Sequence, residues 1–184
     1  IYNLDTGKLE NLTMDWFTDD QISWHPDGNS LYFISDRNHR LETGIINKPK
    51  NHLLYQTDIY SLQIESGLIE RLTDSAYNEM YPCVSNDGQM LAYISDKSGI
   101  NNIYIQDLED TDSKAITNII TGITQLSWNG DNSQLIFTGF YNRGYDIYTL
   151  DNPVQSLEDS IIIRVYGIRE DLDSEFYEPD HPQE

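Results

Sequence analysis

Three stretches of this sequence align without gaps: SWHPDGNSLYF (Ser23–Phe33), CVSNDGQMLAY (Cys83–Tyr93) and SWNGDNSQLIF (Ser127–Phe137). In each stretch, two segments of alternating apolar and polar residues flank a short polar segment built around an Asp. This pattern is typical of two strands joined by a tight turn. Internal repetition is the primary sign of a repeat architecture. The sequence therefore predicts an all-β protein built from repeated units.

Two further signatures give the size of one unit. An Ile-Tyr pair follows each stretch at Ile59, Ile103 and Ile147, and these pairs are 44 residues apart. A Leu-Thr or Ile-Thr pair then closes the unit at Leu72 and at Ile116. Four short strands, which we name a to d in chain order, fit into such a period. This length and strand count match one blade of a β-propeller.

The repeated motifs resemble a known family. The segments WHPDGNSLYFISDR (24–37) and SNDGQMLAYISDK (85–97), with the Ile-Tyr and Leu-Thr pairs, are similar to the WD40-like repeat of TolB-like β-propellers. Such propellers also occur in prolyl-oligopeptidase and tricorn-type peptidases. The resemblance implies an all-β chain that forms a β-propeller fragment of about three to three and a half four-stranded antiparallel blades with the 44-residue repeat.

The repeat also predicts the domain organisation. We expect residues 1–166 to form the partial propeller and the acidic residues 167–184 to be a tail or linker. The expected parts of the propeller are strands c and d of an incomplete blade (1–13), a blade with an insertion at 37–57 (21–73), a second blade (81–117) and a third (124–166) whose strand d is Ile161–Tyr166. Unpaired strand edges are pairing hazards, so we expect neighbouring blades or a second copy to cover both ends.

The composition excludes two classes of partner. Eleven Lys and Arg against 31 Asp and Glu give a net charge of −20, which repels phosphate backbones and anionic lipid surfaces. No apolar run approaches the ~20 residues that a membrane-spanning helix needs. We therefore expect no nucleic-acid binding and no membrane insertion.

The sequence holds neither of two common hydrolase motifs. A serine hydrolase of the α/β type needs G-x-S-x-G, and a zinc peptidase needs H-E-x-x-H; neither occurs. The single cysteine, Cys83, excludes an internal disulfide and lies at a strand position where a small core residue is expected. We expect no catalytic residue and no cofactor in this segment, apart from one candidate site for a divalent cation such as calcium.

The candidate cation site lies on one face of the propeller. In an up-and-down blade, the d–a and b–c loops open on the same face, and Asp19 and Glu79 share one repeat position before the innermost strand. We expect both carboxylates to line the mouth of the central channel. They either bind a divalent cation through oxygen ligands, attract a cationic peptide or are solvated loop acids.

The insertion of the first blade opens on the same face. It carries Arg37, Arg40, Lys48 and Lys50 against one acid, Glu42. Long insertions in repeat proteins often map to binding surfaces. The alternative is that these cations pair with the carboxylates of the neighbouring loops and only rigidify the rim. The sequence leaves both interpretations open.

Other repeated residues have structural interpretations. Trp24 and Trp128 share one repeat position, which predicts packing between blades. Asp36 and Asp96 end the second strand of their units, where we expect them to anchor the strand end. The Asp-Gly pairs supply the positive φ and the local hydrogen bonds that short hairpins require.

These features together predict a function. We expect a non-catalytic propeller that binds a protein or peptide or serves as a scaffold, as a segment of a larger protein. An acidic rim favours a cationic partner. The residues expected to contact it are Trp16, Asp19, Asp20, His39, Arg40, Tyr77, Glu79, Tyr141 and Arg143.

The resemblance implies one alternative function and a location. The alternative is the substrate-gating propeller domain of a multidomain peptidase whose catalytic domain lies outside this chain. Because TolB-like proteins are commonly exported in bacteria, the resemblance also implies a periplasmic or extracellular location.

Overall fold

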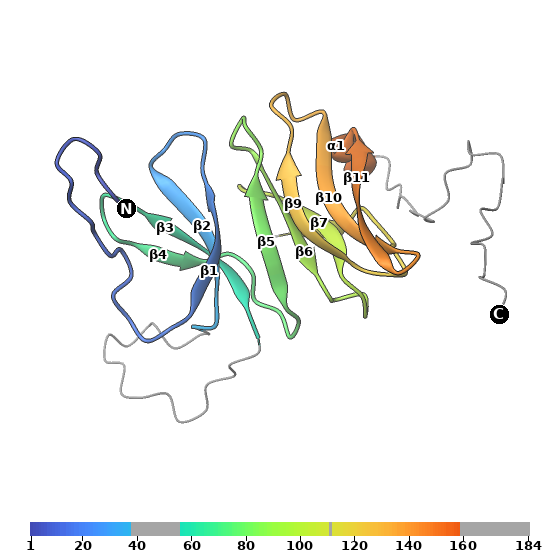
Figure 1. The fold of residues 1–184 in the computed structure, drawn as a ribbon, viewed down its shortest axis with the longest axis horizontal. Helices are drawn as coiled ribbons and strands as arrows, with labels where there is room; N and C mark the ends of the chain where they lie inside the picture. The colour runs from blue at the N-terminus through green and yellow to red at the C-terminus, as the bar shows by residue number, and fades with distance from the viewer. Residues whose placement is uncertain (38–55, 111, 159–184) are drawn as a thin grey trace, which may run out of the picture.

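Three antiparallel β-sheets stand side by side in the computed structural model, which describes residues 1–37, 56–110 and 112–158 (Figure 1). The first sheet contains β1 (Asp19–Trp24), β2 (Ser30–Ser35), β3 (Asp58–Gln63) and β4 (Ile69–Arg71). The second contains β5 (Glu79–Val84), β6 (Met90–Ser95), β7 (Asn102–Asp107) and β8 (Ser113–Ala115). The third contains β9 (Ile123–Trp128), β10 (Gln134–Tyr141) and β11 (Gly144–Asp151).

Within each sheet the strands follow one another in chain order. This is the up-and-down arrangement that the repeat predicts, and β1, β5 and β9 are the a strands of successive units. The all-β prediction is therefore confirmed, with sheets of four, four and three described strands.

The beginning of the chain is less regular than expected. Residues 1–13 form a hairpin with a single bridge, between Tyr2 and Leu9, where the sequence predicted strands c and d. The ammonium group of Ile1 donates a hydrogen bond to the carbonyl oxygen of Glu10 at 2.7 Å. A hairpin without further strands beside it is marginally stable, and no other strand of the described chain pairs with this one.

A short helix follows the third sheet, where the sequence predicted only strands. Asn152 has a φ of +49°, which ends β11, and α1 (Pro153–Glu158) begins with a proline, whose fixed φ suits the first helical position. Among the described residues, no helix has the length and apolar composition needed to cross a membrane. The expected strand Ile161–Tyr166, the acidic segment 167–184 and most of the insertion (38–55) lie outside the described residues.

The a–b turns have the predicted chemistry. Asp27 and Asp87 each accept a hydrogen bond from the backbone N–H two residues later, at 2.8 and 3.1 Å. Gly28 and Gly88 have φ of +74° and +75°, a region that glycine enters without steric cost. Asn132 takes the equivalent place in the third sheet with a φ of +61°. The Asp-Gly pairs therefore act as turn residues.

Each a strand carries a β-bulge that the sequence analysis did not predict. Gln21, Tyr81 and Gln125 occupy the same repeat position, and their φ angles are +52°, +52° and +56°. The pairing register shifts at this place in all three sheets. A bulge bends its strand and increases the local twist. The side-chain oxygen of Gln21 also accepts a hydrogen bond from the backbone N–H of Tyr81 at 2.6 Å, which links the first two sheets.

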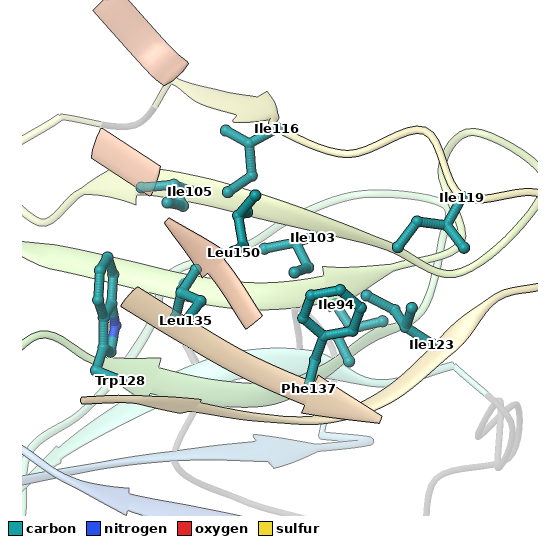
Figure 2. Packing of buried hydrophobic residues seen from close by; sticks show 11 residues of the cluster. Ile94, Ile103, Ile105, Ile116, Ile119, Ile123, Trp128, Leu135, Phe137 and Leu150 are labelled. Atoms are coloured by element: carbon teal, nitrogen blue, oxygen red, sulfur yellow. The ribbon is translucent and has the colours of Figure 1, made fainter. Parts of the chain in front are cut away.

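Apolar clusters join neighbouring sheets. The first cluster contains Tyr32, Ile34 and Ile59 of the first sheet and Val84, Leu91, Tyr93 and Tyr104 of the second. The second contains Ala92, Ile94, Ile103, Ile105 and Ile116 on one side and Ile119, Ile123, Trp128, Leu135, Phe137 and Leu150 on the other (Figure 2). In both, strands a, b and c of the later sheet contribute side chains that pack on strands b and c of the earlier one.

The two repeated tryptophans differ in burial. Trp128 is 8% exposed, and its indole N–H donates to the carbonyl oxygen of Cys83 at 3.0 Å, as expected for packing between blades. Trp24 is 53% exposed, so the same prediction is wrong for Trp24. The reason is that the first sheet has no four-stranded neighbour on that side within the described chain. Cys83 is partly buried against the second cluster, and burial raises the pKa of its thiol.

We expect Ile103→Ala to lower the free energy of unfolding by about 2–5 kcal/mol, because Ile103 is fully buried between two sheets. Ile120→Ala removes the same atoms from an exposed side chain and should change this energy by less than about 0.5 kcal/mol. Urea titrations followed by circular dichroism measure both. Equal losses in the two variants would contradict the packing of the sheets.

Candidate functional site

The candidate site is the face on which strand a begins and strand b ends in each sheet, which we call the rim. The arrows of β5 and β9 point upward in Figure 1, so the rim lies at the bottom of that view. Asp36 and Asp96 each accept a hydrogen bond at 2.9 Å, from the backbone N–H groups of Thr18 and Asn78 respectively. Both aspartates tie the end of strand b to the loop before strand a, which confirms their prediction as anchors.

Arg37 organises the rim of the first sheet. Its side chain is completely buried, and its guanidinium group pairs with Asp19 and, at 3.3 Å, with Asp15. The guanidinium carbon also lies 5.0 and 5.4 Å from the ring centres of Phe33 and Tyr60. A cation over an aromatic ring gains electrostatic energy, most where water is excluded. Arg37 is therefore part of the folded structure and not a cation free to bind a partner.

This ion pair bears on the two interpretations of the basic insertion. For Arg37, the structure shows the pairing with neighbouring carboxylates that rigidifies the rim. The other cations of the insertion, Arg40, Lys48 and Lys50, lie outside the described residues, as does His39. The predicted contact residues His39 and Arg40 therefore stay predictions from the sequence.

Glu79 is buried in the junction between the first and second sheets. The residue is only 2% exposed. The hydroxyl group of Ser75 donates to its carboxylate at 2.6 Å, and those of Thr73 and Ser95 lie at 3.3 and 3.5 Å. Burial is the largest influence and raises the pKa of Glu79 to about 7. The expectation that this carboxylate lines an open channel mouth does not hold, because the junction encloses it.

The first residue of strand a is thus stabilised in three different ways. Asp19 pairs with Arg37, Glu79 is held by hydroxyl groups, and Ile123 is 1% exposed in an apolar cluster. All three side chains occupy one repeat position; Glu79 and Ile123 lie in junctions between described sheets, whereas Asp19 lies at the end of the first sheet. Such a position accepts an acid only where an internal partner compensates for the loss of hydration.

The described residues do not bring Asp19 and Glu79 together as a metal site. Within residues 1–37, 56–110 and 112–158, no group of three or more His, Cys, Asp or Glu has an arrangement that could hold a metal ion. Asp19 is engaged by Arg37 and Glu79 by hydroxyl groups. Asp19 and Glu79, the candidate cation ligands, therefore make separate interactions within the folded chain.

Five predicted contact residues on the described rim are exposed: Trp16, Asp20, Tyr77, Tyr141 and Arg143. Trp16 precedes β1, Tyr77 precedes β5, and Tyr141 ends β10, so each of the three sheets presents at least one aromatic side chain. Two hollows lie near the first sheet, and none of the predicted contact residues lines either of them.

The segment Gly139–Tyr145, which carries the predicted contact residues Tyr141 and Arg143, is a tight hairpin. Strand β10 continues to Tyr141, which pairs with Gly144 at the start of β11. The two turn residues between them, Asn142 and Arg143, have φ of +45° and +70°, as in the two-residue turns that match the twist of a hairpin. Arg143 is exposed at the tip.

The sequence analysis missed the exposed apolar residues on the outer face of the third sheet. Phe140, Tyr145 and Ile147 are exposed there. The period-two alternation of β10 and β11 was available as a signal, since it places these residues on the side that faces away from the second sheet. The repeat alone did not show that this side has no described neighbour.

Three successive up-and-down sheets with this packing define a partial β-propeller. The TolB protein of Acinetobacter baumannii matches with a TM-score of 0.62 and 18% identity, over 82% of this chain and 34% of that protein. A puromycin-hydrolyzing peptidase of Mycobacterium tuberculosis matches with a TM-score of 0.52 and 18% identity, over 74% of this chain and 19% of the peptidase. The chain is therefore structurally similar to TolB and to peptidase propellers.

Two relatives match by sequence. The uncharacterized protein Atu1656 of Agrobacterium fabrum is 21% identical, over 76% of this chain and 46% of that protein. The uncharacterized peptidase YuxL of Bacillus subtilis is 24% identical, over 84% of this chain and 22% of the peptidase. The chain thus spans less than half the length of these relatives. No protein-family model matches the sequence.

We expect Glu79→Gln to remove a pH dependence of stability. Because the pKa of Glu79 is raised from 4.5 to about 7, the folded chain keeps a proton that the unfolded chain has lost between these pH values. The free energy of unfolding therefore falls as the pH rises through this range, by about 3 kcal/mol in total. Urea titrations at pH 5, 6, 7 and 8 should show that the variant becomes more stable relative to the wild type as the pH rises.

The matched control is Glu70→Gln, which changes an exposed carboxyl on β4. Its stability should follow the wild type at every pH. A Glu79→Gln variant with the pH dependence of the wild type would show that the buried carboxyl does not titrate in this range.

We expect Arg37→Ala to lower the free energy of unfolding by about 3–5 kcal/mol, because it leaves two carboxylates without their buried cation. Lys97→Ala changes the same repeat position in the second sheet, where the side chain is exposed, and should cost less than about 0.5 kcal/mol. Thermal and urea unfolding measure both variants. A wild-type unfolding midpoint for Arg37→Ala would disprove its organising role.

Proposed function

We propose that this chain is a non-catalytic binding module of a larger propeller protein, and that its rim contacts a protein or peptide. The observation that carries the proposal is the exposure of one aromatic side chain on the rim of each sheet. Trp16 is 75% exposed, and Tyr77 and Tyr141 are each 43% exposed. Trp and Tyr are enriched among the residues that dominate binding energy at protein interfaces.

The charge of the chain favours a cationic partner. The net charge is −20, and two described cations at the rim of the first sheet are paired with carboxylates: Arg37 with Asp15 and Asp19, and Arg71 with Asp58 and Asp74. An acidic surface raises the rate at which a cationic partner associates, and salt weakens this effect. Aromatic side chains would then supply the affinity, while the acidic field supplies steering.

The contact surface that we propose is smaller than the one expected from the sequence. It contains Trp16, Asp20, Tyr77, Tyr141 and Arg143, all of which are exposed. Asp19 contributes to this contact surface only indirectly, by holding Arg37 in place. Glu79 acts indirectly as well, by joining the first two sheets from within.

A second candidate function is supported by the sequence similarity to YuxL. That similarity covers 84% of this chain and 22% of the peptidase, as expected for one domain of a multidomain enzyme. In this alternative, the propeller controls access of substrate to a catalytic domain outside this chain. Hydrolysis of aminoacyl p-nitroanilides by the full-length parent protein would favour this function over the binding module.

A periplasmic or extracellular location is part of the proposal. A parent protein recovered in the periplasmic fraction or the medium of its native cells would support it. Recovery only with the cytosol would contradict it.

We expect a phage-displayed library of random peptides, selected on this chain, to enrich peptides rich in Lys and Arg. Trp16→Ser and Tyr77→Ser should each weaken the enriched peptides at least about tenfold in surface plasmon resonance, because each removes an aromatic anchor. Leu68→Ser is the control, since Leu68 is an exposed apolar residue in the c–d turn on the opposite face. Enrichment without basic residues, or an equal loss in the control, would contradict binding at the rim.

A further inference from the structure

The two junctions between the described sheets use the same four repeat positions with different chemistry. Between the first and second sheets these positions hold Asp58, Thr73, Ser75 and Glu79. Between the second and third sheets, 44 residues later, they hold Asn102, Thr117, Ile119 and Ile123. All of these side chains except that of Ser75 belong to buried residues. The first junction therefore buries two carboxyl groups at positions where the second has no ionisable group.

The threonine of each junction has the same backbone partner. The hydroxyl oxygen of Thr73 accepts a hydrogen bond from the N–H of Ile59 at 2.8 Å, and that of Thr117 accepts one from the N–H of Ile103 at 2.9 Å. The backbone frame is thus common to both junctions. They differ in the group that receives the hydroxyl proton of the threonine.

In the second junction that group is a neutral amide. The side-chain oxygen of Asn102 accepts hydrogen bonds from the hydroxyl group of Thr117 at 3.0 Å and from the backbone N–H of Ile119 at 2.7 Å. Ile119 and Ile123 complete this junction with apolar side chains. No change of pH within the ordinary range alters the charge of these groups.

In the first junction the corresponding group is the carboxyl group of Glu79, and it holds a loop. Residues 73–78, which we call the 73–78 loop, carry the chain from the first sheet to the second (Figure 1). The loop supplies two of the three hydroxyl groups around Glu79, those of Thr73 and Ser75. At its other end, Asp96 accepts hydrogen bonds from the backbone and side-chain N–H groups of Asn78 at 2.9 and 3.0 Å. The carboxyl group of Glu79 is therefore an internal support of the loop.

Most charges that face Glu79 have the same sign as its carboxylate. Asp58 on β3 and Asp96 after β6 both disfavour a second negative charge there. Arg71 on β4 pairs with Asp58 at 2.7 Å and with Asp74 at 2.9 Å. Burial raises the pKa of Asp58 as well, and its pairing with Arg71 acts in the opposite direction.

Two phenol groups of the second sheet complete the surroundings of Glu79. Burial raises the pKa of Tyr93 to about 12 and also raises the pKa of Tyr104. Both phenols are therefore neutral at the pH at which Glu79 titrates. They add no cation that could compensate for an ionised Glu79.

We propose that the first junction is a pH-dependent latch on the rim: protonated Glu79 keeps the 73–78 loop closed, and ionised Glu79 favours an open loop that admits water. A buried carboxylate beside other carboxylates is costly, and hydration through the loop relieves this cost. The second junction has no carboxyl group at these positions, so the equivalent loop, residues 117–122, stays closed at every pH.

The direction of the effect follows from the two states of the loop. In the closed state the pKa of Glu79 is about 7, whereas hydration in the open state returns it toward 4.5. The free energy of opening is therefore largest at acidic pH and falls as the pH rises through this range. Tyr77 lies on this loop, so the latch would also regulate the contact surface of the rim; this consequence alone rests on the proposed function.

Hydrogen exchange of the 184-residue chain, followed by mass spectrometry, tests the latch without any partner. After correction for intrinsic exchange rates, the 73–78 loop should lose protection at least about tenfold between pH 5 and pH 8. The 117–122 loop should keep its protection and serves as the internal control. An equal loss in both loops, or no loss in the 73–78 loop, would overturn the latch and leave peptide binding at the rim unaffected.

Low concentrations of urea separate loop opening from a general loss of stability. If Glu79 only stabilises the whole chain, the 73–78 loop exchanges through global unfolding, with the same urea dependence as the buried strand β7. Opening of the loop alone exposes little surface, so we expect a clearly smaller urea dependence for the 73–78 loop at pH 8. Equal urea dependence of the loop and β7 would overturn the proposal.

Three variants test the role of the carboxyl group. Glu79→Gln keeps the shape of the side chain without its charge, so the 73–78 loop should stay as protected at pH 8 as at pH 5. Asp58→Asn introduces the residue of the second junction and removes a neighbouring charge, which should move the midpoint of the pH dependence to lower pH. Glu70→Gln, an exposed change on β4, should behave as the wild type. A pH dependence that survives in Glu79→Gln would assign the titration to another group and overturn the proposal.

Discussion

The packing of one sheet, through its strands a, b and c, on strands b and c of the sheet before it is the constraint on which the structure depends. A four-stranded sheet has two apolar faces and cannot bury both alone. Side chains such as Ile103, Leu91 and Trp128 are buried only because a neighbouring sheet lies against them. The 44-residue period follows from this requirement, since every unit must present a matching face to the next.

The same constraint shapes the rim. The first residue of strand a is largely withdrawn from water, so an acid there must find an internal partner. Asp19 finds Arg37 and Glu79 finds three hydroxyl groups, whereas Ile123 needs no polar partner. These buried groups give the rim its shape, and the exposed aromatic residues stand on a surface that they hold in place.

Much of the fold was predictable because its signals are local. The turn residues Asp27 and Asp87 bond to a backbone N–H only two residues away, and alternation of apolar residues needs only one strand. The predictions that were wrong depend on distant neighbours. Trp24 was expected to be buried because Trp128 shares its repeat position, but a side chain is buried only where another sheet covers it. The strands expected in residues 1–13 lack regular pairing for a related reason, since no larger sheet supports them.

The candidate site shows more sharply the same difference between features that local sequence signals determine and features that distant neighbours determine. The sequence by itself determined the repeat, the strand order, the turns and the face on which Trp16, Asp19, Tyr77 and Glu79 gather, because spacing and local hydrogen bonding fix all of these. Only the tertiary structure decided that Arg37 and Glu79 are internal and that Trp16 and Tyr77 are exposed. The physical reason is that exposure and pKa depend on which groups from other sheets exclude water, and no spacing along one chain specifies that.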